Sequence, residues 1–148
     1  MDGNCSFIAE QLKTLLDADI IRLELQKEKQ RSFMGKMFWG GGMVSFGIKP
    51  ALKPYTFNPS AYDLIVIGAP VWAWSPAPPL RTFLKKTSVT GKKIALFICH
   101  GGGPKKAMDK FRAFLAGNDI CAEIDFKNAG NAPEETKQKI AAWVKQLK

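Results

Sequence analysis

The apolar residues of this chain recur in two patterns, one typical of helices and one typical of strands. Helical spacing predicts a helix over 6–16, with Asn4 as its N-cap, and further helices near 78–86, 104–116 and 133–146. Alternating or continuous apolar runs predict strands over 19–25, 63–67, 93–98 and 119–126. Such an alternation of strands and helices indicates a parallel sheet with helices on both faces.

A long connection over 27–55 separates the first predicted strand from the second. It is basic, contains glycine, and includes the aromatic and methionine-rich run from Phe33 to Met43. A connection of this length within one domain is usually functional or partly mobile. Its apolar content indicates that it packs over another part of the protein, with a few helical turns near 31–39.

Two loops that follow predicted strands carry the residues best suited to hold a ligand. One begins at Gly68 and contains Trp72 and Trp74, and the other is the run from Cys99 to Gly103, with three consecutive glycines. Glycine lets the backbone approach a ligand closely. Because such loops line the ligand crevice at the carboxyl ends of parallel strands, both predict a binding site, and the indoles favour a flat aromatic ligand. The alternatives are a plain connector for the glycines and core packing for the indoles.

Composition predicts one globular domain over 1–148 and offers no metal site. The chain has 46% hydrophobic and 24% charged residues, three cysteines and one histidine. Cys5, Cys99 and Cys121 have neither zinc-ligand nor redox spacing, and a single histidine cannot build a histidine-rich metal site. Adjacent Cys99 and His100 would point to opposite faces of a strand, which disfavours a nucleophile–base pair.

The net charge of +9 attracts anionic partners, namely nucleic acid, anionic lipid or an acidic protein. Most of this charge is also compatible with a plain lysine-rich surface, and no helix-turn-helix, RNP or zinc-finger pattern indicates a nucleic-acid reader. No stretch approaches the ~20 apolar residues of a membrane span, and no signal segment is visible. We therefore expect a cytoplasmic protein with no nucleic-acid or membrane partner.

Three motifs stand out in this framework: Asp2-Gly3-Asn4 before the first helix, the run from Tyr62 to Trp72, and Gly91 to Phe97 before the loop at 99–104. Together they resemble the flavodoxin family over nearly the whole chain. The resemblance implies a flavodoxin-like three-layer α/β/α sandwich with a parallel sheet of order 2-1-3-4-5. It also implies FMN at the carboxyl edge of that sheet and electron transfer at the flavin.

The resemblance places the cofactor contacts in three segments and implies no catalytic residue. The N-terminal segment would hold the phosphate, one tryptophan would stack on or flank the flavin ring, and the glycine loop would meet the polar edge of the ring. His100, as a cation near the flavin N1–C2 edge, would favour the anionic reduced flavin. The implied cofactor-binding residues are Asp2, Gly3, Asn4, Cys5, Ser6, Ala69, Pro70, Val71, Trp72, Ala73, Trp74, Cys99, His100, Gly101, Gly102 and Gly103.

The phosphate loop departs from the family pattern, which places hydroxyl residues where this chain has Asp2 and Cys5. The Asp2 carboxylate would repel a phosphate unless it points away or caps the helix. Backbone N–H groups at the helix N-terminus can still hold the anion. We therefore expect FMN to bind with reduced affinity.

The first strand of the family, which lies in the middle of the sheet, has no residues here. Either the strands over 19–25 and 63–67 pair directly, or the sheet has a gap that another chain segment fills. Unpaired backbone groups on both neighbours would cost about 1–3 kcal/mol each, so we expect no open slot. We expect Met1 to be an internal methionine of a longer protein, with homodimerisation by strand exchange as a further option.

Three functions are compatible with these observations. The first is an FMN-binding electron carrier with an acidic redox partner. The second is an enzyme, an FMN-dependent NAD(P)H or quinone-type oxidoreductase, with 27–55 as a lid over its site. The third is a flavin-free scaffold that binds an acidic partner through its lysines.

Overall fold

Three parallel strands form the centre of the structure, a computed structural model that describes residues 3–26, 41–104 and 106–147. They are β1 (Leu64–Trp72), β3 (Lys93–His100) and β4 (Asp119–Lys127). A short strand, β2 (Ser75–Pro76), turns back antiparallel to the end of β1, so the order of the sheet is β2-β1-β3-β4. In the described residues the sheet therefore has four strands instead of the five that the resemblance implied.

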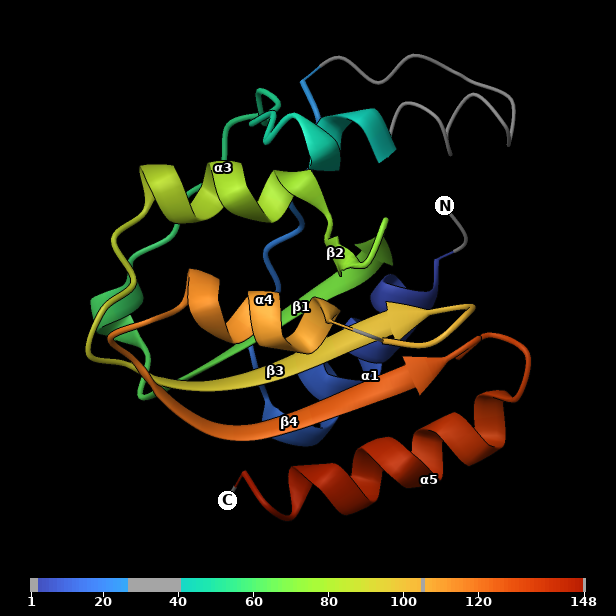
Figure 1. The fold of residues 1–148 in the computed structure, drawn as a ribbon. Coiled ribbons are helices and arrows are strands. Elements are labelled where there is room, and N and C mark those ends of the chain that lie inside the picture. The colour runs from blue at the N-terminus through green and yellow to red at the C-terminus, as the bar shows by residue number, and fades with distance from the viewer. Residues whose placement is uncertain (1–2, 27–40, 105, 148) are drawn as a thin grey trace.

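Helices cover both faces of this sheet (Figure 1). Helix α1 (Asn4–Leu16) and α5 (Pro133–Val144) pack on one face, and α3 (Pro78–Lys86) and α4 (Ala107–Phe114) pack on the other. A single 3-10 turn, Pro59–Ala61, precedes β1. The predicted three-layer α/β/α sandwich is confirmed.

The central strand β3 shows why this sequence requires two helical layers. Its residues from Ile94 to His100 are all buried. Ile94, Leu96 and Ile98 join the core under α3 and α4, while Ala95, Phe97 and Cys99 join the core under α1 and α5. Successive side chains of a strand point to opposite faces, so a continuous apolar run is stable only where both faces are covered.

The prediction of a strand over 19–25 is wrong. The segment has no ladder with β1, and its only pairing among the described residues is an isolated antiparallel bridge between Leu25 and Leu52. A cavity of about 1000 Å³ lies between this segment, α1 and β1. The alternation of Ile21, Leu23 and Leu25 fits a half-buried strand, but the pattern forms a strand only where a neighbour supplies hydrogen bonds.

The cavity also decides between the two arrangements that the sequence left open. Direct pairing of 19–25 with β1 does not occur among the described residues, so the sheet has a gap at this position. Of the two arrangements, the gap is the one observed, and its filling by another chain segment stays a prediction. Backbone groups of β1 along this gap require a hydrogen-bond partner, from solvent or from another chain segment.

The described part of the long connection packs beside α3. Residues 41–45 are helical, Leu52 is buried in the core under α3, and the Thr82 hydroxyl donates to the Pro50 carbonyl at 2.7 Å. The Tyr55 ring lies 5.6 Å from that of Phe83. This confirms that 41–55 packs over another part of the protein, whereas the turns predicted near 31–39 lie outside the described residues. Among the helices of 3–26, 41–104 and 106–147, none has the length and apolar character to cross a membrane.

Candidate functional site

The carboxyl edge of the sheet brings the predicted ligand segments together. β1 ends at Trp72 and β3 ends at His100. The backbone N–H of Asn128, just after β4, donates to the His100 carbonyl at 2.9 Å. Two residues later the N–H of Gly130 donates to the Asn4 side chain at 3.0 Å. These bonds hold the N-terminus of α1 beside the ends of β3 and β4.

The N-terminus of α1 is left open for an anion. Gly3 is the N-cap, in a left-handed conformation with φ of 65°, and no side chain caps this end of the helix among the described residues. The predicted N-cap, Asn4, is instead the first helical residue, because its side chain is engaged by Gly130. The first backbone N–H groups of a helix have no partner within the helix and attract anions. Cys5 and Ser6 follow in this turn, and Asp2 lies outside the described residues.

The turn after β1 presents one indole to solvent. Ala73 and Trp74 both adopt left-handed backbone conformations, with φ of 44° and 56°, and so reverse the chain from β1 into β2. Trp74 is 57% exposed, whereas Trp72 is half-buried and lines the cavity. Two consecutive non-glycine residues in this region carry strain, which is common at ligand sites. Trp74 is therefore the indole of this turn that an aromatic ligand at the edge can reach.

His100 holds the glycine loop from inside the protein. Its Nε2 lies 2.9 Å from Oδ2 of Asp125, and the backbone N–H of Gly103 donates to its Nδ1 at 2.9 Å. Because Nδ1 accepts a hydrogen bond, the ring proton belongs on Nε2, where it is donated to the carboxylate. The side chain is only 5% exposed. This geometry makes His100 a support of the loop, in place of the cation beside a ligand that the resemblance implied.

The glycine loop itself is open to a ligand. Gly101 and Gly102 are exposed, and Gly103 has a φ of 106°, which side-chain-bearing residues rarely adopt. A Cβ atom added at Gly102 or Gly103 would meet no atom within 4 Å. The backbone N–H and C=O groups of this loop can therefore approach a polar ligand edge.

Cys99 is a core residue rather than a nucleophile. Its side chain is buried under α1 and α5. A hydrogen bond with the Cys5 thiol, followed by burial, raises the pKa of the Cys99 thiol far above its usual range. A protonated thiol is a poor nucleophile, so Cys99 provides no covalent chemistry at this edge.

The three predicted segments thus meet at one edge, but not every predicted side chain reaches it. Ala69, Cys99 and His100 are buried, so at these positions only the backbone can contribute. Sequence reasoning missed Asp125, Asn128 and Gly130, which position the loop and α1. Asn128-Ala129-Gly130-Asn131 has the composition of a turn directly after a strand, and that signal could have identified two of the three.

Comparison with solved structures shows the same fold in flavoproteins. A provisionally assigned flavoprotein from Bacteroides eggerthii aligns with a TM-score of 0.79 and 18% identity, covering 97% of this chain and 89% of that chain. A flavoprotein from Lactobacillus acidophilus, solved in complex with FMN, aligns with a TM-score of 0.74 and 18% identity, covering 90% and 91%. At these identities the likeness concerns the fold.

Comparison with curated proteins gave no significant match. A family model described as flavodoxin, however, matches residues 3–147. That match covers nearly the whole chain and agrees with the sandwich and the open carboxyl edge described above. The chain belongs to the flavodoxin family.

Proposed function

We propose that this protein binds FMN across the carboxyl edge of its sheet and acts in electron transfer. The observation that carries the proposal is the meeting of three features at this edge: the uncapped N-terminus of α1, the exposed Trp74 and the open glycine loop. These features match the three parts of FMN, namely a phosphate, a flat aromatic ring and a polar ring edge. The family match and the FMN complex of the Lactobacillus acidophilus flavoprotein support it.

The residues of the edge fit these roles without side-chain chemistry of their own. The N–H groups of Cys5 and Ser6 would hold the phosphate, and Trp74 would flank the ring. Gly101, Gly102 and Gly103 would offer backbone groups to the polar edge, in a loop whose position His100 fixes. When bound, FMN supplies the redox chemistry, and the protein supplies position and electrostatics.

If the protein transfers electrons to another protein, its positive charge requires a partner with an acidic docking face. With a net charge of +9, encounter with an acidic redox partner is accelerated at low ionic strength. We propose an acidic protein as that partner. An FMN-dependent reductase is the alternative, and the described part of its expected lid, 41–55, packs beside α3.

Two kinetic measurements on the FMN-loaded protein separate a carrier from a reductase. The first mixes photoreduced protein with an acidic acceptor protein in stopped flow, and the second follows NAD(P)H oxidation with a quinone in the steady state. We expect fast transfer that slows as ionic strength rises, and no NAD(P)H oxidation beyond that of free FMN. Sustained NAD(P)H turnover would contradict the carrier function and establish the reductase.

A further inference from the structure

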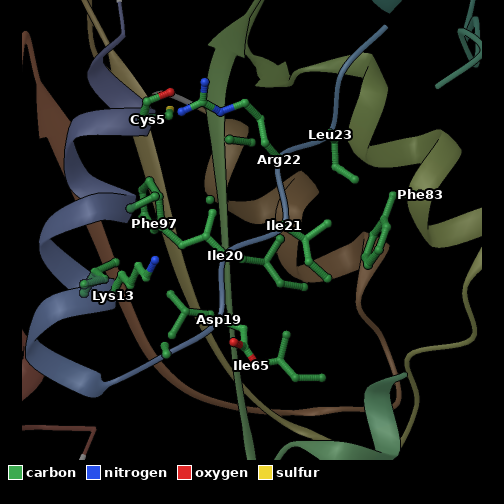
Figure 2. Close-up of a pocket in the computed structure, with 18 of the residues that line it drawn as sticks. Cys5, Lys13, Asp19, Ile20, Ile21, Arg22, Leu23, Ile65, Phe83 and Phe97 are labelled. Carbon is green, nitrogen blue, oxygen red and sulfur yellow. The ribbon is translucent and has the colours of Figure 1, made fainter. Parts of the chain in front are cut away.

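The cavity between β1, α1 and the segment 17–25 lies where a further strand of the sheet would pair with β1 (Figure 2). It runs along β1 and is lined by each of its residues from Leu64 to Pro70. β1 pairs with β3 over those same seven positions, from Leu64↔Lys93 to Pro70↔Cys99. Seven residues of a strand extend about 23 Å. The cavity therefore follows the full ladder-forming length of β1 on the side opposite β3.

The edge of β1 that faces this cavity has no ladder among the described residues. Antiparallel pairing with β2 involves only Val71 and Trp72, at the far end of the strand. Gly68, in the middle of β1, is exposed and lines the cavity. An open strand edge is a row of N–H and C=O groups, which another extended chain can pair with. The backbone groups on this edge of β1 are thus arranged to pair with an extended chain.

Apolar side chains line both sides of the cavity, accompanied on the α1 side by Glu10 and Lys13. On the α1 side it is lined by Ala9, Leu12 and Phe97, and on the α3 side by Leu80 and Phe83. The side chains of an inserted strand would point alternately to these two sides. An occupant buried on both faces must therefore be apolar at consecutive positions, as parallel strands usually are.

The charges at the two ends of the cavity define the direction of an occupant. Asp19 lies at the end where β1 begins, since its carboxylate accepts a hydrogen bond of 2.9 Å from the Tyr62 hydroxyl. The Arg22 guanidinium is directed toward Cys5, at the N-terminus of α1 and the carboxyl edge of the sheet (Figure 2). A chain parallel to β1 would place its amino end near Asp19 and its carboxyl end near Arg22 and the positive end of the helix dipole.

We propose that this cavity is a strand-acceptor site, which binds an extended apolar peptide segment of about seven residues parallel to β1. The inserted segment completes the sheet by backbone hydrogen bonds on the open edge of β1. It buries its side chains against α1 on one side and α3 on the other. This inference does not depend on FMN, and its experiment is carried out in the absence of flavin.

The test uses a synthetic heptapeptide of valine, isoleucine and leucine with one added lysine at its amino end. Its binding to the full chain is measured by fluorescence anisotropy, with a fluorophore on the lysine side chain. Two further peptides have the same side chains but carry N-methyl groups on alternate backbone nitrogens. One is methylated at the odd-numbered positions and the other at the even-numbered positions. A fourth peptide has the reversed sequence, with the lysine at its carboxyl end.

We expect the parent peptide to bind saturably, and one of the two N-methylated peptides to bind at least about tenfold more weakly, because it loses the donors that face β1. The reversed peptide should also bind more weakly. Equal binding of both N-methylated peptides would show a cavity for any apolar molecule and would overturn the proposal. Absence of binding by the parent peptide would also overturn the proposal. This holds even if binding is absent because a second copy of the chain already fills the site.

A pair of protein variants locates the binding. Ile20, which is 36% exposed and lines the cavity, is replaced in Ile20→Glu. The control is Ile48→Glu, at an isoleucine that is 46% exposed and does not line the cavity. We expect Ile20→Glu to weaken peptide binding at least about tenfold and Ile48→Glu to leave it unchanged, with near-UV circular dichroism confirming that both fold. Equal binding by both variants would place the peptide elsewhere and contradict the assignment.

Discussion

At the residue scale, the Phe97 ring of β3 lies directly against the backbone of Gly68 in β1. A Cβ atom added at Gly68 would lie 1.9 Å from the Cζ atom of Phe97. The Phe97 ring is buried under α1 and α5, and it lies 6.4 Å from the Phe126 ring in an edge-on arrangement. Glycine is thus required at position 68 by the close approach of a neighbouring ring.

We therefore expect Gly68→Ala to destabilise the protein by about 1–3 kcal/mol, because the added methyl group displaces the Phe97 ring from its present contacts. Urea unfolding measures this loss. Gly102→Ala is the matched control, since a Cβ atom there meets nothing within 4 Å, and its effect should stay within about 0.5 kcal/mol. The added substitution Phe97→Leu should recover part of the loss. A Gly68→Ala protein as stable as Gly102→Ala would contradict this packing.

Trp74 is the residue whose side chain the FMN proposal uses most directly. We expect Trp74→Ala to weaken FMN binding about tenfold or more, since stacking on an aromatic side chain contributes ~1–3 kcal/mol per base. Stability should change little, because the indole is 57% exposed. Phe46→Ala removes an aromatic ring that is 83% exposed and lies in the segment packed beside α3, so it should leave affinity unchanged. Equal affinities of the two variants would remove Trp74 from the site.

At the element scale, the ends of β3 and β4 are joined by the pair His100 and Asp125, which also sets the glycine loop. His100→Ala leaves the Gly103 N–H without its acceptor and the Asp125 carboxylate without its donor. We expect a loss of about 1–3 kcal/mol in stability, measured by urea unfolding, together with weaker FMN binding.

The conservative variant Asp125→Asn distinguishes loop positioning from a charge effect on the ligand. Its side-chain oxygen can still accept the Nε2–H of His100, so the loop should stay in place. We expect FMN affinity close to that of the parent protein for Asp125→Asn and clearly reduced affinity for His100→Ala. An equal loss in both variants would show that the carboxylate charge, and not the hydrogen bond, acts on the site.

The sequence predicted most elements because their signals are local. Apolar spacing identified α1, α3, α4 and α5, and continuous apolar runs identified β1, β3 and β4, although β1 extends to Trp72 and passes the predicted end at 67. The segment 19–25 was mispredicted because alternation indicates a strand without indicating a partner. Asn4 was mispredicted as a cap because Gly130, 126 residues away in the sequence, engages its side chain.

At the scale of the whole molecule, topology brings together what the sequence predicted separately. Each of the three ligand segments was visible as a loop or a helix start, and parallel pairing explains why they meet at one edge. The direction of each side chain was not predictable in this way. His100 illustrates this, because its inward orientation depends on Asp125 in a strand that pairs only in the folded protein.

The cavity beside β1 is also a property of the whole molecule. No single segment encodes it, since its walls come from α1, the segment 17–25, β1 and α3. It lies along the strand edge, whereas the proposed FMN site lies at the ends of the strands, although Cys5 and Ser6 border both. The two proposals are therefore tested separately, and one can fail without the other.

The FMN proposal is tested most simply by titrating the flavin-free chain with FMN and following the quenching of flavin fluorescence. We expect saturable quenching at micromolar FMN or below, and much weaker binding of riboflavin, which lacks the phosphate that the N-terminus of α1 would hold. Absence of saturable quenching would contradict the FMN proposal. Equal affinity for riboflavin would contradict the role assigned to the N-terminus of α1.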